Sequence, residues 1–251
     1  MAAAPTQYLR EQRTVTVRGK PEVWQLVWKG RPRPACGPDD VEMAITCPCT
    51  GWAYGEVGRL VLQRKLGGRT IDRLALGPFF TDLPADNADG LAIMQWRPFE
   101  MNDMDETGAD GAALPTLLTQ IKARPGPRAM QVADYDHDGN ATEFLIQVSA
   151  GPCGHSEYIS VGVSHDRPKL HALGTADSPG QALSMAGSAW QALLSRERES
   201  HVTVWPCGDH GSDERQELVL SAERGSIRAI LRRYSCPEDG SRERLLGSEA
   251  L

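Results

Sequence analysis

The chain has 251 residues, enough for one sizeable domain or two small ones, and its formal net charge at pH 7 is −6. An acidic chain without a basic patch is not typical of proteins that bind nucleic acid or an anionic membrane surface. No apolar run approaches the ~20 residues that cross a bilayer, so the sequence predicts no membrane span. We expect a single β-rich domain over residues 1–251, with a soft boundary in the acidic segment 82–111 as the alternative.

The start of the chain, Met1-Ala-Ala-Ala-Pro5, lacks the basic and apolar regions of a signal peptide. The protein is therefore either cytoplasmic or a mature segment to which a start Met was added. The six cysteines lie in or beside turns: Cys36, Cys47, Cys49, Cys153, Cys207 and Cys236. An even number of cysteines in such loops is typical of disulfides, which form in oxidising compartments. We favour a secreted or periplasmic protein, with a cytoplasmic one as the alternative.

Alternating or short apolar runs indicate strands in the first half of the chain. They lie at residues 15–17, 24–28, 41–45, 60–62 and 71–76, and a further apolar piece at 91–96 lies within the irregular acidic segment. The first two are joined across Gly19-Lys20-Pro21, and 60–62 and 71–76 form a hairpin that turns at Gly67-Gly68. The hairpin's basic residues are expected on its solvated outward face: Arg59, Arg64, Lys65, Arg69 and Arg73.

Two segments have helical spacing of their apolar residues. In residues 114–121 four apolar side chains fall on one face, and Pro125 follows the segment. In residues 181–195 the apolar positions again keep to one face, which we expect to pack against a core. The sequence therefore predicts two short helices.

The most specific chemistry lies between these helices, in the segment Asp134-Tyr-Asp136-His-Asp138-Gly139-Asn140. Carboxylates at alternate positions followed by Gly supply the oxygen ligands and the sharp bend that calcium requires. Close carboxylates repel each other unless a cation neutralises them, so we predict a calcium site and keep a solvated turn as the alternative. The predicted ligands are Asp134, Asp136, Asp138, the carbonyl group of Asn140, and either Thr142 or Glu143.

This loop departs from an EF-hand, because its twelfth position is Leu145 instead of Glu. The residues after the loop alternate in polarity over 144–148 and predict a strand. In that setting the segment resembles the calcium loop of FG-GAP repeats in integrin-type β-propellers. The resemblance covers the loop only and implies a propeller-like fold. Where that family usually has an acidic residue this chain has Thr142, so the last ligand is the Thr142 hydroxyl or the Glu143 carboxylate.

The second half of the chain again reads as strands. They are predicted at 144–148, 159–163, 202–204, 218–220 and 227–231. The last two are joined by the turn Glu223-Arg224-Gly225-Ser226. Over the whole chain the patterns predict an all-β fold, propeller-like or a sandwich, with about a dozen short antiparallel strands and two short helices.

Two turns offer a second metal site. Cys153 and His155 lie in one turn, and Cys207 and His210 lie in another. Two Cys and two His could form a closed, structural zinc site. We favour a disulfide between Cys153 and Cys207, with the histidines as polar loop groups, since disulfides suit an exported protein.

Motifs for catalysis are absent from the sequence. It contains no Gly-x-Ser-x-Gly elbow, His-Glu-x-x-His pair, Walker loop or dinucleotide fingerprint. We therefore expect an exported, calcium-binding, disulfide-stabilised β-protein that acts as a binding or structural module for a protein or carbohydrate ligand. The alternative is a metal-dependent hydrolase whose site lies at the Asp134 loop and the Cys/His turns.

Overall fold

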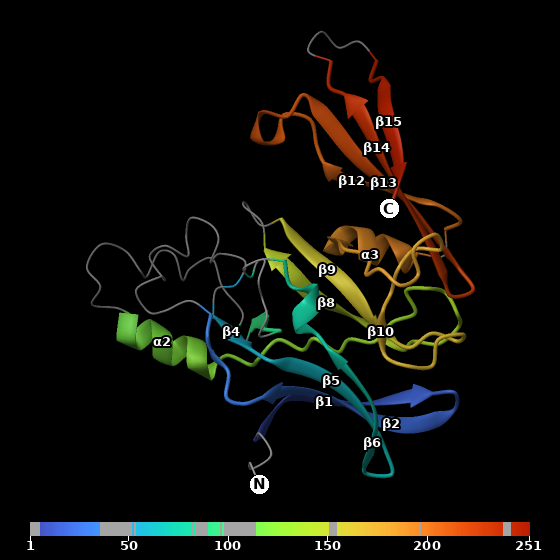
Figure 1. The fold of residues 1–251 in the computed structure, drawn as a ribbon. Coiled ribbons are helices and arrows are strands. Elements are labelled where there is room, and N and C mark those ends of the chain that lie inside the picture. Colours follow the sequence, from blue (N-terminus) through green and yellow to red (C-terminus); the bar gives the residue numbers. More distant parts are fainter. Residues whose placement is uncertain are drawn as a thin grey trace. The chain divides into compact units, whose positions relative to one another are not determined.

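A computed structural model describes residues 6–35, 52, 54–81, 83, 90–95, 97, 114–150, 155–195, 197–237 and 242–251. These residues form fifteen β-strands in four sheets and two α-helices (Figure 1). The all-β class and the two helices are confirmed. Among the described residues no sheet closes into a barrel and no propeller is formed.

The chain divides into two compact units. The first comprises Met1–Met130 and Gln147–Glu157, and the second comprises Gln131–Ile146 and Tyr158–Leu251. The single domain over 1–251 stays a prediction. Within the described residues no helix has the length and apolar character that crossing a membrane requires.

The larger sheet of the first unit has the strand order β1-β2-β5-β6. Its strands are β1 (Gln7–Val17), β2 (Lys20–Lys29), β5 (Leu60–Leu66) and β6 (Arg69–Ala75). Alternation in β2 buries Trp24, Leu26 and Trp28 on one face, as the sequence pattern predicts.

The turns of this sheet are short. Gly67 and Gly68, both with positive φ, form the predicted turn between β5 and β6. The turn between β1 and β2 begins earlier than predicted, at Arg18 and Gly19, because these two residues take positive φ values and Lys20 already pairs with Val17.

The smaller sheet of the first unit contains β3 (Arg33–Pro34), β4 (Gly55–Gly58) and β7 (Ala92–Gln95). Helix α2 (Leu114–Ala123) confirms the first predicted helix. The predicted strand at 41–45 and most of the acidic segment 82–111 lie outside the described residues.

A buried ion pair joins β2 to β5 and corrects one expectation. The Arg64 guanidinium donates to the Glu22 carboxylate from Nε at 2.7 Å and from Nη2 at 2.8 Å. Trp24 Nε1 donates to the same carboxylate at 3.2 Å, and the Arg64 guanidinium lies 5.7 Å from the centre of the Trp24 ring. The prediction that Arg64 is solvated is wrong: the residue is 5% exposed, because its charge is neutralised inside the sheet.

The larger sheet of the second unit has the order β12-β13-β14-β15. Its strands are β12 (Ser200–Trp205), β13 (Glu214–Glu223), β14 (Ser226–Ser235) and β15 (Leu245–Ala250). The predicted turn at Arg224-Gly225 joins β13 to β14, with both residues at positive φ. Apolar side chains of β13 and β14 form a core with Trp190 of helix α3 (Gly187–Leu193) and with Tyr135.

A third group of strands contains β8 (Glu143–Ala150), β9 (Ser156–Gly162), β10 (His171–Ala172) and β11 (Met185–Ala186). The second predicted helix, 181–195, was predicted to begin earlier than helix α3 does in the structure. Its first residues bond elsewhere: Gln181 N donates to Ser178 O, and Leu183 N donates to Leu173 O. Met185 and Ala186 form strand β11 in extended conformation, so α3 begins only at Gly187.

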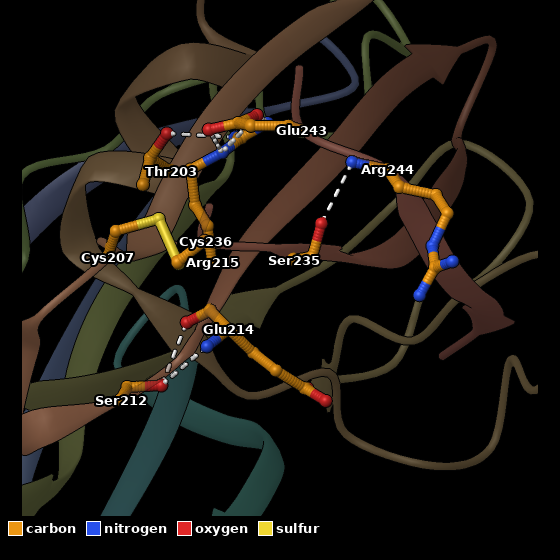
Figure 2. The surroundings of a disulfide bond; sticks show 9 residues. All are labelled: Thr203, Cys207, Ser212, Glu214, Arg215, Ser235, Cys236, Glu243 and Arg244. Atoms are coloured by element: carbon orange, nitrogen blue, oxygen red, sulfur yellow. Dashed lines mark hydrogen bonds and ion pairs between the residues drawn. A yellow bond between two sulfur atoms is a disulfide. The ribbon is translucent and has the colours of Figure 1, made fainter. Parts of the chain in front are cut away.

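A disulfide joins Cys207 to Cys236, with 5.6 Å between the two Cα atoms (Figure 2). The predicted pairing of Cys207 with Cys153 is therefore wrong. The two cysteines flank β13 and β14, whose paired ends bring Glu214 opposite Ser235, and Cys236 N donates to Asp213 O at 2.8 Å. Strand pairing thus selects the cysteine partner, which spacing alone does not determine. Cys36, Cys47, Cys49 and Cys153 lie outside the described residues.

Candidate metal centre

The Asp-rich loop is closed at its base by a pair of backbone hydrogen bonds. Ala133 N donates to Glu143 O at 2.8 Å, and Glu143 N donates to Ala133 O at 3.1 Å. Between these residues the chain turns sharply, with His137 at φ 54° and Gly139 at φ 93°. Only Gly takes such a φ without steric cost, which explains the Gly after the third Asp.

The aspartate side chains point into this loop and accept its amide protons. Asp134 accepts from Asp138 N at 3.0 Å and from Gly139 N at 3.1 Å. Asp136 Oδ1 accepts from Asp138 N at 3.2 Å, and Asp138 Oδ1 accepts from Asn140 N at 2.7 Å. One oxygen from each of the three carboxylates lies within 4.8 Å of the other two, so the three predicted aspartates are brought together.

Asp136 is the centre of this cluster. The residue is 1% exposed, and its Oδ2 atom makes no hydrogen bond to any described residue. Burial raises the pKa of the Asp136 carboxyl to about 6; the charges of Asp138 and Asp134 add to this shift, and the nearby Ser164 hydroxyl opposes it. A buried carboxylate oxygen without a donor is costly unless a proton or a cation reaches it.

Segments distant in sequence hold the loop from outside. Gly225 N, in the β13–β14 turn, donates to Asp136 O at 2.8 Å, and Arg224 N donates to His137 O at 3.2 Å. The Nε2 atom of His137 lies 2.6 Å from the carbonyl oxygen of Leu193, at the end of α3. Asp138 Oδ2 also accepts the backbone N–H of His165. The sequence analysis did not identify these contacts, because no local pattern indicates which distant turn packs against a loop.

Glu143 and Thr142 are buried, but they do not belong to the cluster of possible metal ligands that the three aspartates form. The Thr142 hydroxyl oxygen lies 2.7 Å from Glu143 Oε1 and 2.7 Å from the Val163 carbonyl oxygen. A hydroxyl has one proton and a carbonyl can only accept, so both contacts are hydrogen bonds when Glu143 is protonated. Burial, followed by the charge of Asp136, raises the pKa of Glu143 to about 9, which agrees with this arrangement. The Asn140 carbonyl accepts from Thr142 N at 3.0 Å. The roles of Asn140, Thr142 and Glu143 as ligands stay predictions.

The donor set consists of carboxylate oxygens, which suit a hard cation such as calcium. The alternative zinc site at Cys153, His155, Cys207 and His210 loses one of its thiolates, because Cys207 is bonded to Cys236. Among the described residues no group of His and Cys side chains lies close enough to hold a metal.

No protein-family model, curated protein or solved structure matches this chain. The resemblance to FG-GAP loops therefore rests on the Asp134, Asp136 and Asp138 cluster alone.

The raised pKa values predict how the stability of the metal-free protein depends on pH. The folded protein keeps a proton on Asp136 up to about pH 6, whereas the unfolded chain releases it near its ordinary pKa of 3.8. The free energy of unfolding should therefore fall as the pH rises from about 4 to about 6 and beyond, where Glu143 adds to the trend. Urea unfolding of metal-free wild type and Asp136→Asn at about pH 4.5 and about pH 7.5 measures this. Equal pH dependence in the two proteins would contradict the burial of an ionisable Asp136.

Proposed function

We propose that the protein is an exported calcium-binding β-protein in which the loop from Asp134 to Asn140 binds one calcium ion. One observation carries this proposal: the Oδ2 atom of Asp136 is buried beside two other carboxylates, and no described residue donates a hydrogen bond to it. A divalent cation would supply the positive charge that this atom lacks. A merely solvated turn does not account for a carboxylate that is 1% exposed.

The ligands available to calcium are oxygen atoms of Asp134, Asp136 and Asp138, with the Asn140 carbonyl, Thr142 and Glu143 as further candidates. Calcium takes six to eight oxygens in a flexible arrangement, so water completes the set where protein atoms do not. Both oxygens of Asp134 and the Oδ2 atom of Asp138 each accept one hydrogen bond from a backbone amide, so each keeps a second lone pair for the ion. When bound, the ion neutralises the charges that the loop brings together.

A bound calcium ion would act here as a structural brace. The loop is bonded to the β13–β14 turn through Gly225 and Arg224, to the end of α3 through His137, and to His165 through Asp138. Fixing the loop would fix these three segments as well. This supports a binding or structural module, whose protein or carbohydrate ligand we leave as a prediction.

Export is supported by one feature of the structure, the disulfide, and it agrees with the proposed calcium site. The Cys207–Cys236 disulfide needs an oxidising compartment to form and persist. Weak extracellular calcium sites are saturated at the millimolar calcium found outside cells. The hydrolase alternative receives less support, since one of its Cys/His turns contains a disulfide-bonded Cys207 instead of a metal-binding thiolate.

Calcium should raise the thermal stability of the protein, because the folded loop binds the ion and the unfolded chain does not. At a hundredfold excess of calcium over its dissociation constant, the expected gain is ~2.7 kcal/mol. Thermal unfolding of metal-free protein, with and without added calcium, measures the effect. Asp136→Ala should abolish it, whereas Asp177→Ala, which changes an exposed aspartate of the same unit, should not. A calcium-induced shift of equal size in wild type and Asp136→Ala would count against the assignment.

A further inference from the structure

A second candidate site lies in the first unit, far in sequence from the Asp loop. It is an open pocket of about 500 Å³, within the range of small-molecule sites. Its walls come from β1, β2, β4 and the chain segments that follow β2 and β7. The lining side chains are Tyr8, Leu9, Arg10, Trp28, Arg31, Pro32, Glu56 and Arg97.

A β-bulge places Arg10 in this pocket. Leu9 pairs with Val27 and Glu11 pairs with Leu26, so Arg10 is an extra residue in β1 without a partner in β2. Bulges re-aim a side chain and are frequent beside functional sites. The Arg10 guanidinium is then fixed by donating from Nη2 to Gln95 O at 2.9 Å and to the Pro127 carbonyl oxygen at 3.2 Å.

Two of the side chains that line this pocket carry a buried N–H donor to which no described residue offers an acceptor. Arg10 Nε and Trp28 Nε1 have no hydrogen-bond partner among the described residues. Trp28 is 2% exposed, and its ring packs against Gly58, where even a Cβ atom would come within 3.1 Å of the ring. Buried N–H groups normally have an acceptor, so two of them in one pocket point to a ligand that supplies acceptor atoms.

The described side chains that line the pocket carry a net positive charge, since three of them are arginines and one is a glutamate. Arg31 is exposed, and in the described part of the chain it makes no ion pair, so its guanidinium is available to a ligand. Burial raises the pKa of the Glu56 carboxyl, and the nearby positive charges of Arg10 and Arg97 oppose this shift. Tyr8 and Leu9 add exposed apolar surface at the rim.

We propose that this pocket binds a small organic anion, a carboxylate or a phosphate monoester that carries an apolar body. The anionic oxygens accept hydrogen bonds from Arg10, Trp28 and Arg31, and the apolar body lies against Leu9 and Pro32. Arginine is well suited to both anions because its planar N–H groups match their paired oxygens.

Calorimetric titration of the full chain tests this proposal with four probes. Benzoate and phenyl phosphate carry an anion and an apolar body, inorganic phosphate lacks the body, and benzyl alcohol lacks the charge. We expect saturable binding of one molecule per chain for benzoate or phenyl phosphate, and the stronger of the two identifies the anion. Inorganic phosphate should bind more weakly and benzyl alcohol not at all. Failure of both benzoate and phenyl phosphate to bind would overturn the proposal.

A pair of matched variants separates the pocket from net charge. Arg31→Gln should weaken binding about tenfold, the change expected for one charge-assisted hydrogen bond. Arg69→Gln removes the same charge from an exposed position in the β5–β6 hairpin and should bind like wild type. Equal weakening in both variants would overturn the proposal, because binding would then follow total charge.

The indole N–H resonance of Trp28 gives a local readout. It is the resonance that disappears from the two-dimensional NMR spectrum of Trp28→Phe, and it should move downfield when the bound probe accepts its hydrogen bond. No movement at saturating probe would overturn the role of Trp28 and the assigned pocket. If Trp28→Phe does not fold, the comparison of Arg31→Gln with Arg69→Gln still decides the outcome.

Discussion

Replacing Arg64 with Met should lower the free energy of unfolding by about 3–5 kcal/mol, the usual cost of removing one partner of a buried ion pair. Arg64 and Glu22 are each 5% exposed, and their side chains are joined by two hydrogen bonds of 2.7 and 2.8 Å. Arg64→Met leaves the Glu22 carboxylate buried, with the Trp24 indole as its one remaining donor in the part of the chain that the structure describes. Urea unfolding measured by circular dichroism gives the change.

Two further variants isolate the charge from the packing. Glu22→Gln combined with Arg64→Met removes the uncompensated carboxylate and should recover part of the lost stability. Arg69→Met, at an exposed position of the same hairpin, should leave stability within about 0.5 kcal/mol of wild type. A loss for Arg64→Met no larger than that for Arg69→Met would show that the ion pair is not buried as described.

Replacing both Cys207 and Cys236 with Ser should destabilise the protein by ~3.5 kcal/mol on the chain-entropy model. The disulfide closes a loop with a sequence separation of 29, which contains the whole of β13 and β14. Without the bond the unfolded chain gains conformational entropy, and this lowers the free energy of unfolding.

The test compares wild type with the double variant by urea unfolding under non-reducing conditions. Peptide mapping of the wild type should recover the peptides of Cys207 and Cys236 joined to each other. Free thiols at these positions, or a double variant as stable as wild type, would contradict the bond and remove one support for export.

Several strands were predictable because one of their faces is buried, although β4, which also has a buried face, was not predicted. The alternation around Trp24, Leu26 and Trp28 directly reflects such a face, and the turn at Gly67-Gly68 reflects a local requirement for positive φ. Local sequence patterns did not predict the burial of a residue whose partner is distant in the sequence. Arg64 follows the pattern of a solvated residue, yet Glu22, 42 residues away, neutralises it within the sheet.

The candidate site was predictable only in part, because some of its features are local to one loop and others depend on distant segments. Spacing along one loop brings Asp134, Asp136 and Asp138 together, so the sequence alone could identify the carboxylates. The depth of Asp136 depends instead on the β13–β14 turn, whose Gly225 donates to the Asp136 carbonyl. Cysteine pairing likewise depends on the register of β13 and β14, which spacing in the sequence does not reveal.

The central claim is that the loop from Asp134 to Asn140 is a calcium site, and calorimetric titration of the metal-free protein with calcium tests it most directly. We predict one calcium ion per chain for wild type and for Asp177→Asn, an exposed control, and no binding for Asp136→Asn. Asp136→Asn keeps the shape of the side chain and removes the charge that the buried Oδ2 atom shares. A wild type that binds no calcium, or an Asp136→Asn variant that binds it as tightly as wild type, would contradict the account.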